Sequence, residues 1–227
     1  MHKKQYVVIG MGRFGTSVAS TLLNAGQEVL VIDSNEEIIQ KVSEFATHAV
    51  IADSTNETSL KELGLWNFDV IVVAIGHDVQ ASMLTTLLLK EMGVKHIVAK
   101  ADNALHGKML EKVGADKVVF PERDMGQRIA HNLMSTNVIE YFEVAPDLGI
   151  IEIAAYGKLV GTSLLEANLR EKYGITVIAL RRNGKLFLSP NPSEKFIRMD
   201  TLILVGDSNG IQRFEADYSI GQEAAYS

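Results

Sequence analysis

The sequence predicts an α/β protein with a doubly wound parallel sheet and a second, smaller α+β lobe at the C-terminal end. Residues 6–33 have the order strand, glycine turn, helix, strand and acid. Apolar runs and amphipathic segments then alternate as far as residue 120, as strands and helices do around a parallel sheet. Around residues 143–149 the pattern changes to shorter strands and a hairpin turn. These three observations predict a Rossmann-like first domain and a separate second one.

The glycine turn after the first strand has the spacing of a dinucleotide-binding site. An apolar run over residues 6–9 precedes Gly10, Gly12 and Gly15, which form a G-x-G-x-x-G pattern. The first glycine permits a tight turn, the second lets a phosphate approach the backbone, and the third lets the next helix pack close to the sheet. That helix has an apolar stripe beginning at Phe14, and its N-terminus would direct free amides at an anion.

Two charged residues refine this site. Asp33 ends the second strand, where a carboxylate can accept hydrogen bonds from both ribose hydroxyls and repels a 2′-phosphate, so NADP is disfavoured. Arg13 lies in the first turn of the helix, where a cation opposes the helix dipole by roughly 0.3–1 kcal/mol. A phosphate chain or a neighbouring subunit at this point would explain the arginine, and a solvated surface side chain is the alternative.

The remaining elements of the first domain follow in order. We expect strands over residues 29–32, 49–52, 70–75, 97–100 and 117–120, and helices over 38–45, 57–63, 79–92 and 105–113. The continuous apolar run 70–75 is typical of a central strand buried on both faces. Ligands of such sheets bind beyond the carboxyl ends of the strands. The residues at these ends are Gly10, Asp33, Asp53, Ile75, Gly76 and Lys100.

The helix over 79–92 is more apolar than one sheet face requires. Its extra apolar surface indicates either a subunit interface or burial beneath another helix of the same domain. The residues concerned are Val79, Met83, Leu84, Leu87, Leu88, Leu89 and Met92. A long helix with Met125, Ile129 and Leu133 then leads to the second domain.

We expect the first domain over residues 1–142 with this crossover helix, the C-terminal lobe over 143–217, and a loosely ordered tail over 218–227. Asn183 and Gly184 predict a type I′ hairpin turn, because both positions require a positive φ. The lobe should contain strands over 149–155, 175–180, 185–188 and 201–205, one helix over 162–172 capped by Thr162 or Ser163, and a short helix over 210–214.

Composition excludes several classes of protein. The 227 residues contain no cysteine, which excludes disulfides and cysteine nucleophiles, and the formal net charge of −6 argues against nucleic acid as a partner. We expect a cytosolic protein, because no apolar run is long enough to span a membrane and the first strand leaves no room for a signal peptide. The six histidines form no H-x-x-x-H or H-E-x-x-H pair, and no G-x-S-x-G elbow occurs. The chain therefore fits a sensor better than an enzyme.

Several motifs in order resemble one family. IGMGRFG and VID, VVAIG over 72–76, VAKA over 98–101 and GADKVVFPERDMGQRIA over 114–130 are similar to the RCK domain of the Ktr and Trk potassium uptake regulators, most of all the Ktr gating-ring subunits. Residues from 149 onward resemble the small C-terminal lobe of that family. The resemblance implies a homo-oligomer, in which domains dimerise and dimers form an octameric ring under a membrane-embedded potassium transporter. It also implies that adenine nucleotides set the shape of the ring.

The resemblance further implies two ligand sites. In the first, Lys100 would bind a phosphate, and Glu122 would belong to a divalent-cation site for Mg or Ca beside the γ-phosphate. Its residues would be Gly10, Gly12, Arg13, Phe14 and Gly15 for the phosphates, Asp33 and Asn35 for the ribose, Asp53 and Ser54 around the adenine, and Ile75, Gly76, Lys100, Glu122 and Arg123 closing the site. The second site, in the lobe, would bind cyclic di-AMP, a ligand that only some members use, through Asn168, Arg170, Ile175, Ile178 and Pro190.

The expected function is a regulatory subunit on the cytoplasmic face of the membrane that binds ATP or ADP and cyclic di-AMP and gates a potassium transporter without catalysis. Two alternatives remain open. One is an NAD-dependent oxidoreductase, which would need an acid or base aimed at the nicotinamide. The other is a soluble regulator that responds to the NADH/NAD ratio.

Overall fold

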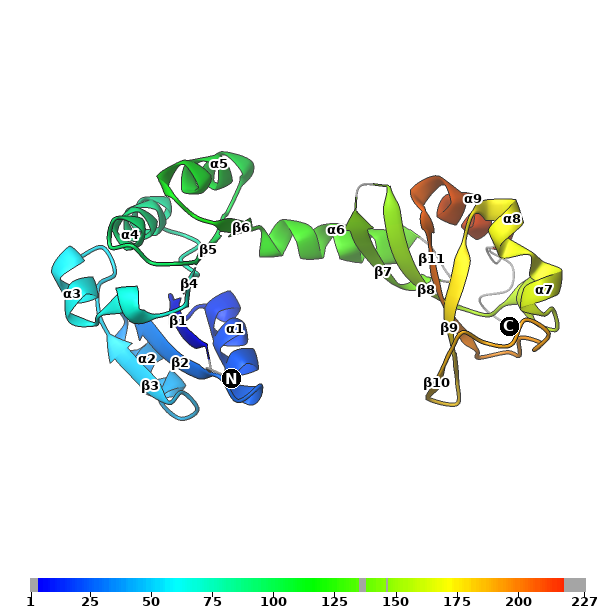
Figure 1. Cartoon of the computed structure of the whole chain (residues 1–227), viewed down its shortest axis with the longest axis horizontal. Coiled ribbons are helices and arrows are strands. Elements are labelled where there is room, and N and C mark those ends of the chain that lie inside the picture. The colour runs from blue at the N-terminus through cyan, green and yellow to red at the C-terminus, as the bar shows by residue number, and fades with distance from the viewer. Residues whose placement is uncertain (1–3, 135–137, 146, 219–227) are drawn as a thin grey trace. The chain divides into compact units, whose positions relative to one another are not determined.

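The computed structural model describes residues 4–134, 138–145 and 147–218, and the chain divides into two compact units, Met1–Arg123 and Asp124–Ser227 (Figure 1). Each unit has a hydrophobic core of its own. No helix among the described residues has the length and apolar character needed to cross a membrane.

The first unit contains the predicted parallel sheet. Its strand order is β3-β2-β1-β4-β5-β6, so the order reverses between β1 and β4, where the ligand crevice of a doubly wound fold opens. All five neighbouring pairs are parallel. The strands are β1 Gln5–Ile9, β2 Glu28–Asp33, β3 His48–Ile51, β4 Val70–Val73, β5 Ile97–Lys100 and β6 Lys117–Val119.

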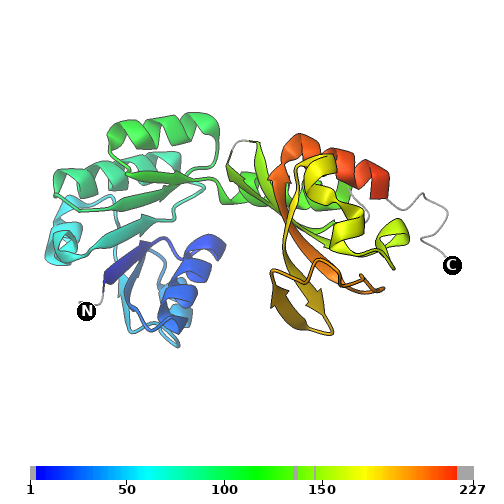
Figure 2. The ribbon, with the colours of Figure 1, turned by 45° about the vertical axis from the view of Figure 1, so that its right-hand side comes forward.

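Helices cover both faces of this sheet. The helices are α1 Arg13–Asn24, α2 Glu36–Val42, α3 Glu57–Glu62, α4 Val79–Glu91 and α5 Ala104–Val113, with a short 3₁₀ turn η1 at Leu65–Asn67. A further helix, α6 Pro121–Met134, follows β6 and continues past Arg123 into the second unit. One core cluster joins the sheet to α1 and α2, and another joins the opposite face to α3, α4 and α5. α4 and α5 lie side by side (Figure 2). The doubly wound fold is confirmed.

Burial within the same unit accounts for part of the apolar surface of helix α4, and the subunit interface stays a prediction. Leu89 is fully buried and Leu88 is 8% exposed, because both side chains belong to the core under the sheet. Leu84 and Leu87 are 39% and 38% exposed. The helix is therefore covered on one side by its own unit, and it presents two leucines on the other.

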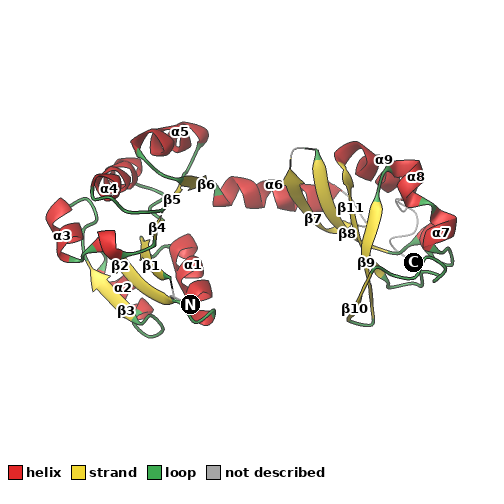
Figure 3. Cartoon of the chain, in the orientation of Figure 1, coloured by secondary structure: helices red, strands yellow, loops and turns green. Residues whose placement is uncertain are grey.

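The second unit is built on an antiparallel sheet with strand order β10-β9-β11-β8-β7 (Figure 3). Its core includes Ile151, Phe196 and Phe214, each 1% exposed or less. The elements are β7 Val138–Ala145, β8 Leu148–Ala154, η2 Gly157–Leu159, α7 Leu164–Ala167, α8 Leu169–Tyr173, β9 Thr176–Arg182, β10 Lys185–Leu188, β11 Thr201–Asp207 and α9 Ser208–Tyr218.

The structure adds one strand to this unit and corrects one expectation. Strand β7 was not predicted, and its range includes residues 142 and 143, between which the domain limit is expected. The single helix expected over 162–172 is broken at Asn168, whose φ of 46° and ψ of 46° are left-handed and separate α7 from α8. The predicted cap is confirmed at Ser163, which forms a capping box with Glu166.

The hairpin turn is confirmed, since φ is 50° at Asn183 and 74° at Gly184. The expected short helix over 210–214 is the centre of α9. The loosely ordered tail expected from residue 218 falls, from residue 219 on, outside the described residues.

Candidate nucleotide-binding site

A cavity of about 550 Å³ lies at the carboxyl ends of the strands of the first unit. The structure brings most of the predicted nucleotide residues to its lining, and Gly15, Asn35 and Arg123 lie outside it. The predicted residues in the lining are Gly10, Gly12, Arg13, Phe14, Asp33, Asp53, Ser54, Ile75, Gly76, Lys100 and Glu122. Residues that sequence analysis did not assign to the site also line the cavity, namely Ile9, Ser34, Ala52, Thr55, Ala74, His77, Asp78 and Ala81.

The three glycines of the turn have the geometry that their spacing predicts. Gly10 has a φ of 91°, which favours glycine. A Cβ on Gly12 would meet no atom within 4 Å, so the space in front of this residue is open to a ligand. A Cβ on Gly15 would lie 1.9 Å from the Gly10 carbonyl oxygen, because α1 packs directly against the turn. Gly15 therefore lies outside the cavity lining, where it lets α1 pack close to the turn.

The N-terminus of α1 differs from those of the neighbouring helices. α2, α3, α4 and α5 begin with side chains that accept hydrogen bonds from backbone amides, at Asn35, Asn56, Asp78 and Asn103. α1 begins at Gly12 without a side-chain cap, and its first turn has no acidic residue. Its first amides therefore remain available to an anion in the cavity.

Asp33 connects the glycine turn to the end of β2. Its Oδ2 accepts a hydrogen bond from the Met11 amide at 2.6 Å, and its Oδ1 accepts one from the Asn35 amide at 2.9 Å. Each carboxylate oxygen has a second lone pair, so both can still accept from ribose hydroxyls. The side chain of Asn35 does not reach the cavity, because its Oδ1 caps α2 by accepting from the Glu37 and Ile38 amides. Its predicted contact with the ribose is therefore not supported.

An ion pair occupies the opposite end of the cavity. Lys100 Nζ donates to Glu122 Oε1 at 2.6 Å, with the lysine side chain 10% exposed and the glutamate side chain 66% exposed. This hydrogen bond lowers the pKa of Glu122, and the positive charge of Arg13 lowers it further. A Cβ on Gly76 would lie 2.8 Å from Lys100 Nζ, so a glycine here makes room for the lysine.

The charges along the cavity are ordered. Arg13 and Lys100 supply cations near the glycine turn and the end of β5, whereas Asp33 and Asp53 supply carboxylates at the ends of β2 and β3. Two further acids line the cavity, Glu122, which is paired with Lys100, and Asp78, which caps α4. Hydrogen bonds from the Thr55 hydroxyl and amide lower the pKa of Asp53, so this acid is ionised at neutral pH. Such an order suits a molecule with phosphates at one end and hydroxyl or amino donors at the other.

The other two predictions for this site are not supported by the geometry. Among the described residues, no group of three or more His, Asp or Glu side chains is placed to hold a metal ion, and Glu122 is paired with Lys100. The guanidinium carbon of Arg123 lies 3.9 Å from the centroid of the Phe120 ring, outside the cavity lining.

The predicted ligand residues of the lobe differ in how exposed they are. Ile178 is 38% exposed, and Pro190 follows Ser189, whose amide donates to the Ile178 carbonyl at 3.0 Å. The structure thus brings Pro190 beside Ile178. Ile175, in contrast, is 1% exposed because it is part of the core, so its place in a ligand wall stays a prediction.

The other two predicted ligand residues, Asn168 and Arg170, are exposed. Asn168 separates α7 from α8, and its Nδ2 donates to the side chain of Glu171. Arg170 lies in α8.

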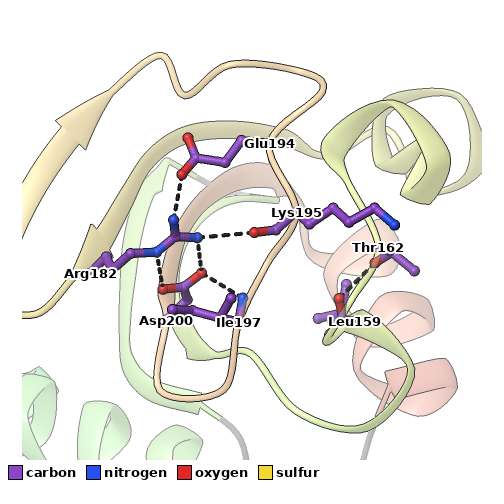
Figure 4. Close-up of polar contacts among 7 residues, drawn as sticks. All are labelled: Leu159, Thr162, Arg182, Glu194, Lys195, Ile197 and Asp200. Atoms are coloured by element: carbon purple, nitrogen blue, oxygen red, sulfur yellow. Dashed lines mark hydrogen bonds and ion pairs between the residues drawn. The ribbon is translucent and has the colours of Figure 1, made fainter.

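Arg182 forms ion pairs and hydrogen bonds with the segment between β10 and β11, which contains Pro190 (Figure 4). Its Nε and Nη2 donate to the two carboxylate oxygens of Asp200 at 2.8 and 2.7 Å, and its Nη1 donates to Glu194. The Asp200 side chain is 1% exposed and also accepts from the Ile197 amide. This pair could not be found from the sequence, because 18 residues separate its members and no local motif marks them.

Family models match both parts of the chain. The TrkA-N domain matches residues 6–121, and the TrkA-C domain matches residues 148–217. The chain belongs to the family of TrkA-N/TrkA-C (RCK) domain proteins. This RCK-domain chain is 47% identical to Ktr system potassium uptake protein C of Bacillus subtilis, over 94% of its own length and 96% of that protein. It is 45% identical to Ktr system potassium uptake protein A of the same organism, over 93% and 96%.

Solved structures agree on the fold. The crystal structure of the GsuK RCK domain superimposes with a TM-score of 0.69 at 18% identity, covering 95% of this chain and 47% of that one. A structure of the GsuK channel bound to NAD superimposes with a TM-score of 0.68 at 18% identity, covering 97% and 40%. This RCK-domain chain thus spans less than half of either solved chain.

Proposed function

We propose that this chain is the cytoplasmic regulatory subunit of a potassium uptake system, and that it binds ATP or ADP in the cavity of its first unit. The observation that carries this proposal is the placement of charges around that cavity, with Arg13 at the open glycine turn, Lys100 at the end of β5, and Asp33 and Asp53 at the ends of β2 and β3. Identity to Ktr potassium uptake proteins along nearly the whole chain supports the potassium system.

In the bound state, the glycine turn and the α1 amides hold phosphates, and Asp33 accepts hydrogen bonds from the ribose. A terminal phosphate replaces Glu122 as the partner of Lys100. The carboxylate released in this way is then available to a divalent cation, Mg or Ca, which would neutralise the phosphates. NAD(H) shares the adenosine half of such a ligand and competes for the same cavity.

A nucleotide can change the conformation of the assembly only through a difference in affinity between two states. Arg13 is the candidate for detecting that difference. Its exposed side chain stands at the start of the phosphate-facing helix, and a long cation can reach a γ-phosphate held by a neighbouring subunit. ATP then gains an ion pair that ADP lacks. A ring of eight chains transmits the resulting change to the membrane-embedded transporter.

The exposed leucines of α4 provide the first test of this assembly. Leu87→Asp is expected to convert an oligomer of about eight chains into smaller species, because an unpaired carboxylate would be buried in the interface. Light scattering of the intact protein at micromolar concentration measures the mass. Phe45→Asp is the control, since Phe45 is 43% exposed and lies just after α2, which packs on the opposite face of the sheet from α4. A monomeric unmodified protein would contradict the proposed ring, and an unchanged mass for Leu87→Asp would exclude the exposed leucines of α4 from its interfaces.

The second unit is proposed to bind cyclic di-AMP on the two-fold axis of a dimer. A two-fold symmetric ligand meets each contact twice in a symmetric dimer, so one ligand should bind per two chains. Ile178 and Pro190 offer an apolar wall to a base, and the exposed Arg170 offers a guanidinium to a phosphate.

Calorimetry of the full chain measures both the stoichiometry and the role of Arg170. Arg170→Ala is expected to lower the affinity for cyclic di-AMP at least tenfold, since a charge-assisted hydrogen bond contributes about 1.5–3 kcal/mol. Lys172→Ala removes another exposed cation from the same helix and should leave the affinity unchanged. One ligand per chain, or equal affinities for the two variants, would rule out the shared site.

A further inference from the structure

The loop after β3 forms one wall of the nucleotide cavity. Residues 52–55 all line it. The Ala52 amide donates to the Asp33 carbonyl at 3.0 Å, so this loop lies directly beside the carboxylate proposed to hold the ribose. Lys100 and Glu122 belong to the opposite end of the sheet, at β5 and after β6. The loop therefore faces the adenosine part of the ligand and lies away from the terminal phosphate.

A buried hydroxyl from α4 fixes this loop. Thr85 Oγ1 donates to the Ser54 carbonyl at 3.1 Å and lies 2.9 Å from Ser54 Oγ. Thr85 is fully buried, and Ser54 is 7% exposed. A threonine hydroxyl has a single hydrogen, so when Thr85 donates to the carbonyl, the Ser54 hydroxyl must donate to Thr85. The lone pairs of Ser54 Oγ are then left to accept a hydrogen bond from the cavity side.

We propose that Thr85 is a positioning residue for the adenosine end of the nucleotide site. The Thr85 hydroxyl holds both the carbonyl and the hydroxyl of Ser54. Ser54 Oγ is thereby presented to the ligand as a hydrogen-bond acceptor. This inference rests on the proposed nucleotide site and adds a residue outside the cavity lining that tunes its affinity. Asp53 and Thr55 hold the same loop from within, through hydrogen bonds of 2.9 and 2.7 Å to Asp53 Oδ1.

The neighbouring residue supplies a matched comparison. Thr86 is also fully buried in α4, but its hydroxyl donates to the Ser82 carbonyl of the same helix at 2.8 Å. Replacing either threonine by valine removes one buried hydroxyl while conserving the branched shape. Only Thr85→Val leaves the carbonyl and hydroxyl of Ser54 without their partner.

The test compares ATP with inorganic tripolyphosphate, which can occupy only the phosphate end. Thr85→Val is expected to lower the affinity for ATP roughly three- to tenfold, the range that corresponds to losing a typical hydrogen bond, and to leave the affinity for tripolyphosphate unchanged. Thr86→Val should change neither. Calorimetry on the full chain gives both affinities, and thermal melting establishes that each variant is folded. Ser54→Ala, expected to show the same selective loss, serves as the second variant if Thr85→Val does not fold.

The outcomes distinguish a failure of the role proposed for Thr85 from a failure of the proposed nucleotide site. Equal ATP affinities for Thr85→Val and the unmodified protein would overturn the role of Thr85 alone. An equal loss for ATP and tripolyphosphate, or the same loss in Thr86→Val, would show that the hydroxyl only supports the fold. An unmodified protein that binds no ATP would overturn the proposed nucleotide site and this inference with it.

Discussion

Replacing Asp200 with alanine is expected to lower the free energy of unfolding of the second unit by about 3–5 kcal/mol, the usual loss when one partner of a buried ion pair is removed. The Asp200 side chain is 1% exposed, and Arg182, its partner, is 22% exposed. The variant leaves the guanidinium paired only with the exposed Glu194 and the Lys195 carbonyl, and it leaves the Ile197 amide without its acceptor.

Hydrogen exchange followed by mass spectrometry measures this loss strand by strand. We expect faster exchange in β9, β11 and the segment between β10 and β11, and unchanged exchange in β1 and β4 of the first unit. Glu194→Ala is the matched control, because it removes the other carboxylate paired with Arg182, and the Glu194 side chain is 42% exposed. An exposed pair contributes about 1 kcal/mol or less. Equal effects of the two substitutions would show that Asp200 does not hold this segment.

The second large effect concerns the nucleotide. Asp33→Ala is expected to lower the affinities for ATP and ADP at least tenfold, because the ribose loses charge-assisted hydrogen bonds of about 1.5–3 kcal/mol. The Met11 amide of the glycine turn also loses its acceptor at 2.6 Å, which adds to the loss.

Glu28→Ala removes an acid from the other end of the same strand, where Glu28 is exposed, and it should leave both affinities unchanged. Calorimetry on the two variants compares them directly. An unchanged ATP affinity in Asp33→Ala would exclude this carboxylate from the site.

The first unit could be predicted because its signals are local and repeated. Continuous apolar runs mark β1, β2 and β4, which are largely buried. The glycine turn was predicted to the residue: Gly10 has a positive φ, Gly15 lets α1 pack against the turn, and Gly12 leaves the space in front of the backbone open. Most of the cavity followed from the rule that ligands bind at the carboxyl ends of parallel strands.

Three features of the second unit were harder to predict, because no local apolar pattern marks them. β7 is an edge strand with most of its residues exposed, so it lacks the apolar run that marks a buried strand. The break at Asn168 depends on one left-handed residue inside an otherwise helical pattern. The burial of Ile175 depends on how the chain enters β9, which the resemblance alone does not specify.

Residue pairs that are distant in the sequence could not be found from motifs. Ser54 and Thr85 are 31 residues apart, and Arg182 and Asp200 are 18 apart. Each pair joins two elements whose relative placement is a property of the folded unit. Asn35 illustrates the opposite case, in which a local rule, helix capping, takes a side chain that the resemblance assigned to the ligand.

Calorimetric titration of the unmodified chain with ATP, ADP and NAD shows whether the cavity of the first unit binds adenine nucleotides. We expect ATP and ADP to bind at one site per chain and to compete with each other, with affinities that differ because only ATP carries a γ-phosphate for Arg13. Binding of NAD alone, with no heat from ATP or ADP at concentrations up to the millimolar range, would contradict the proposed function.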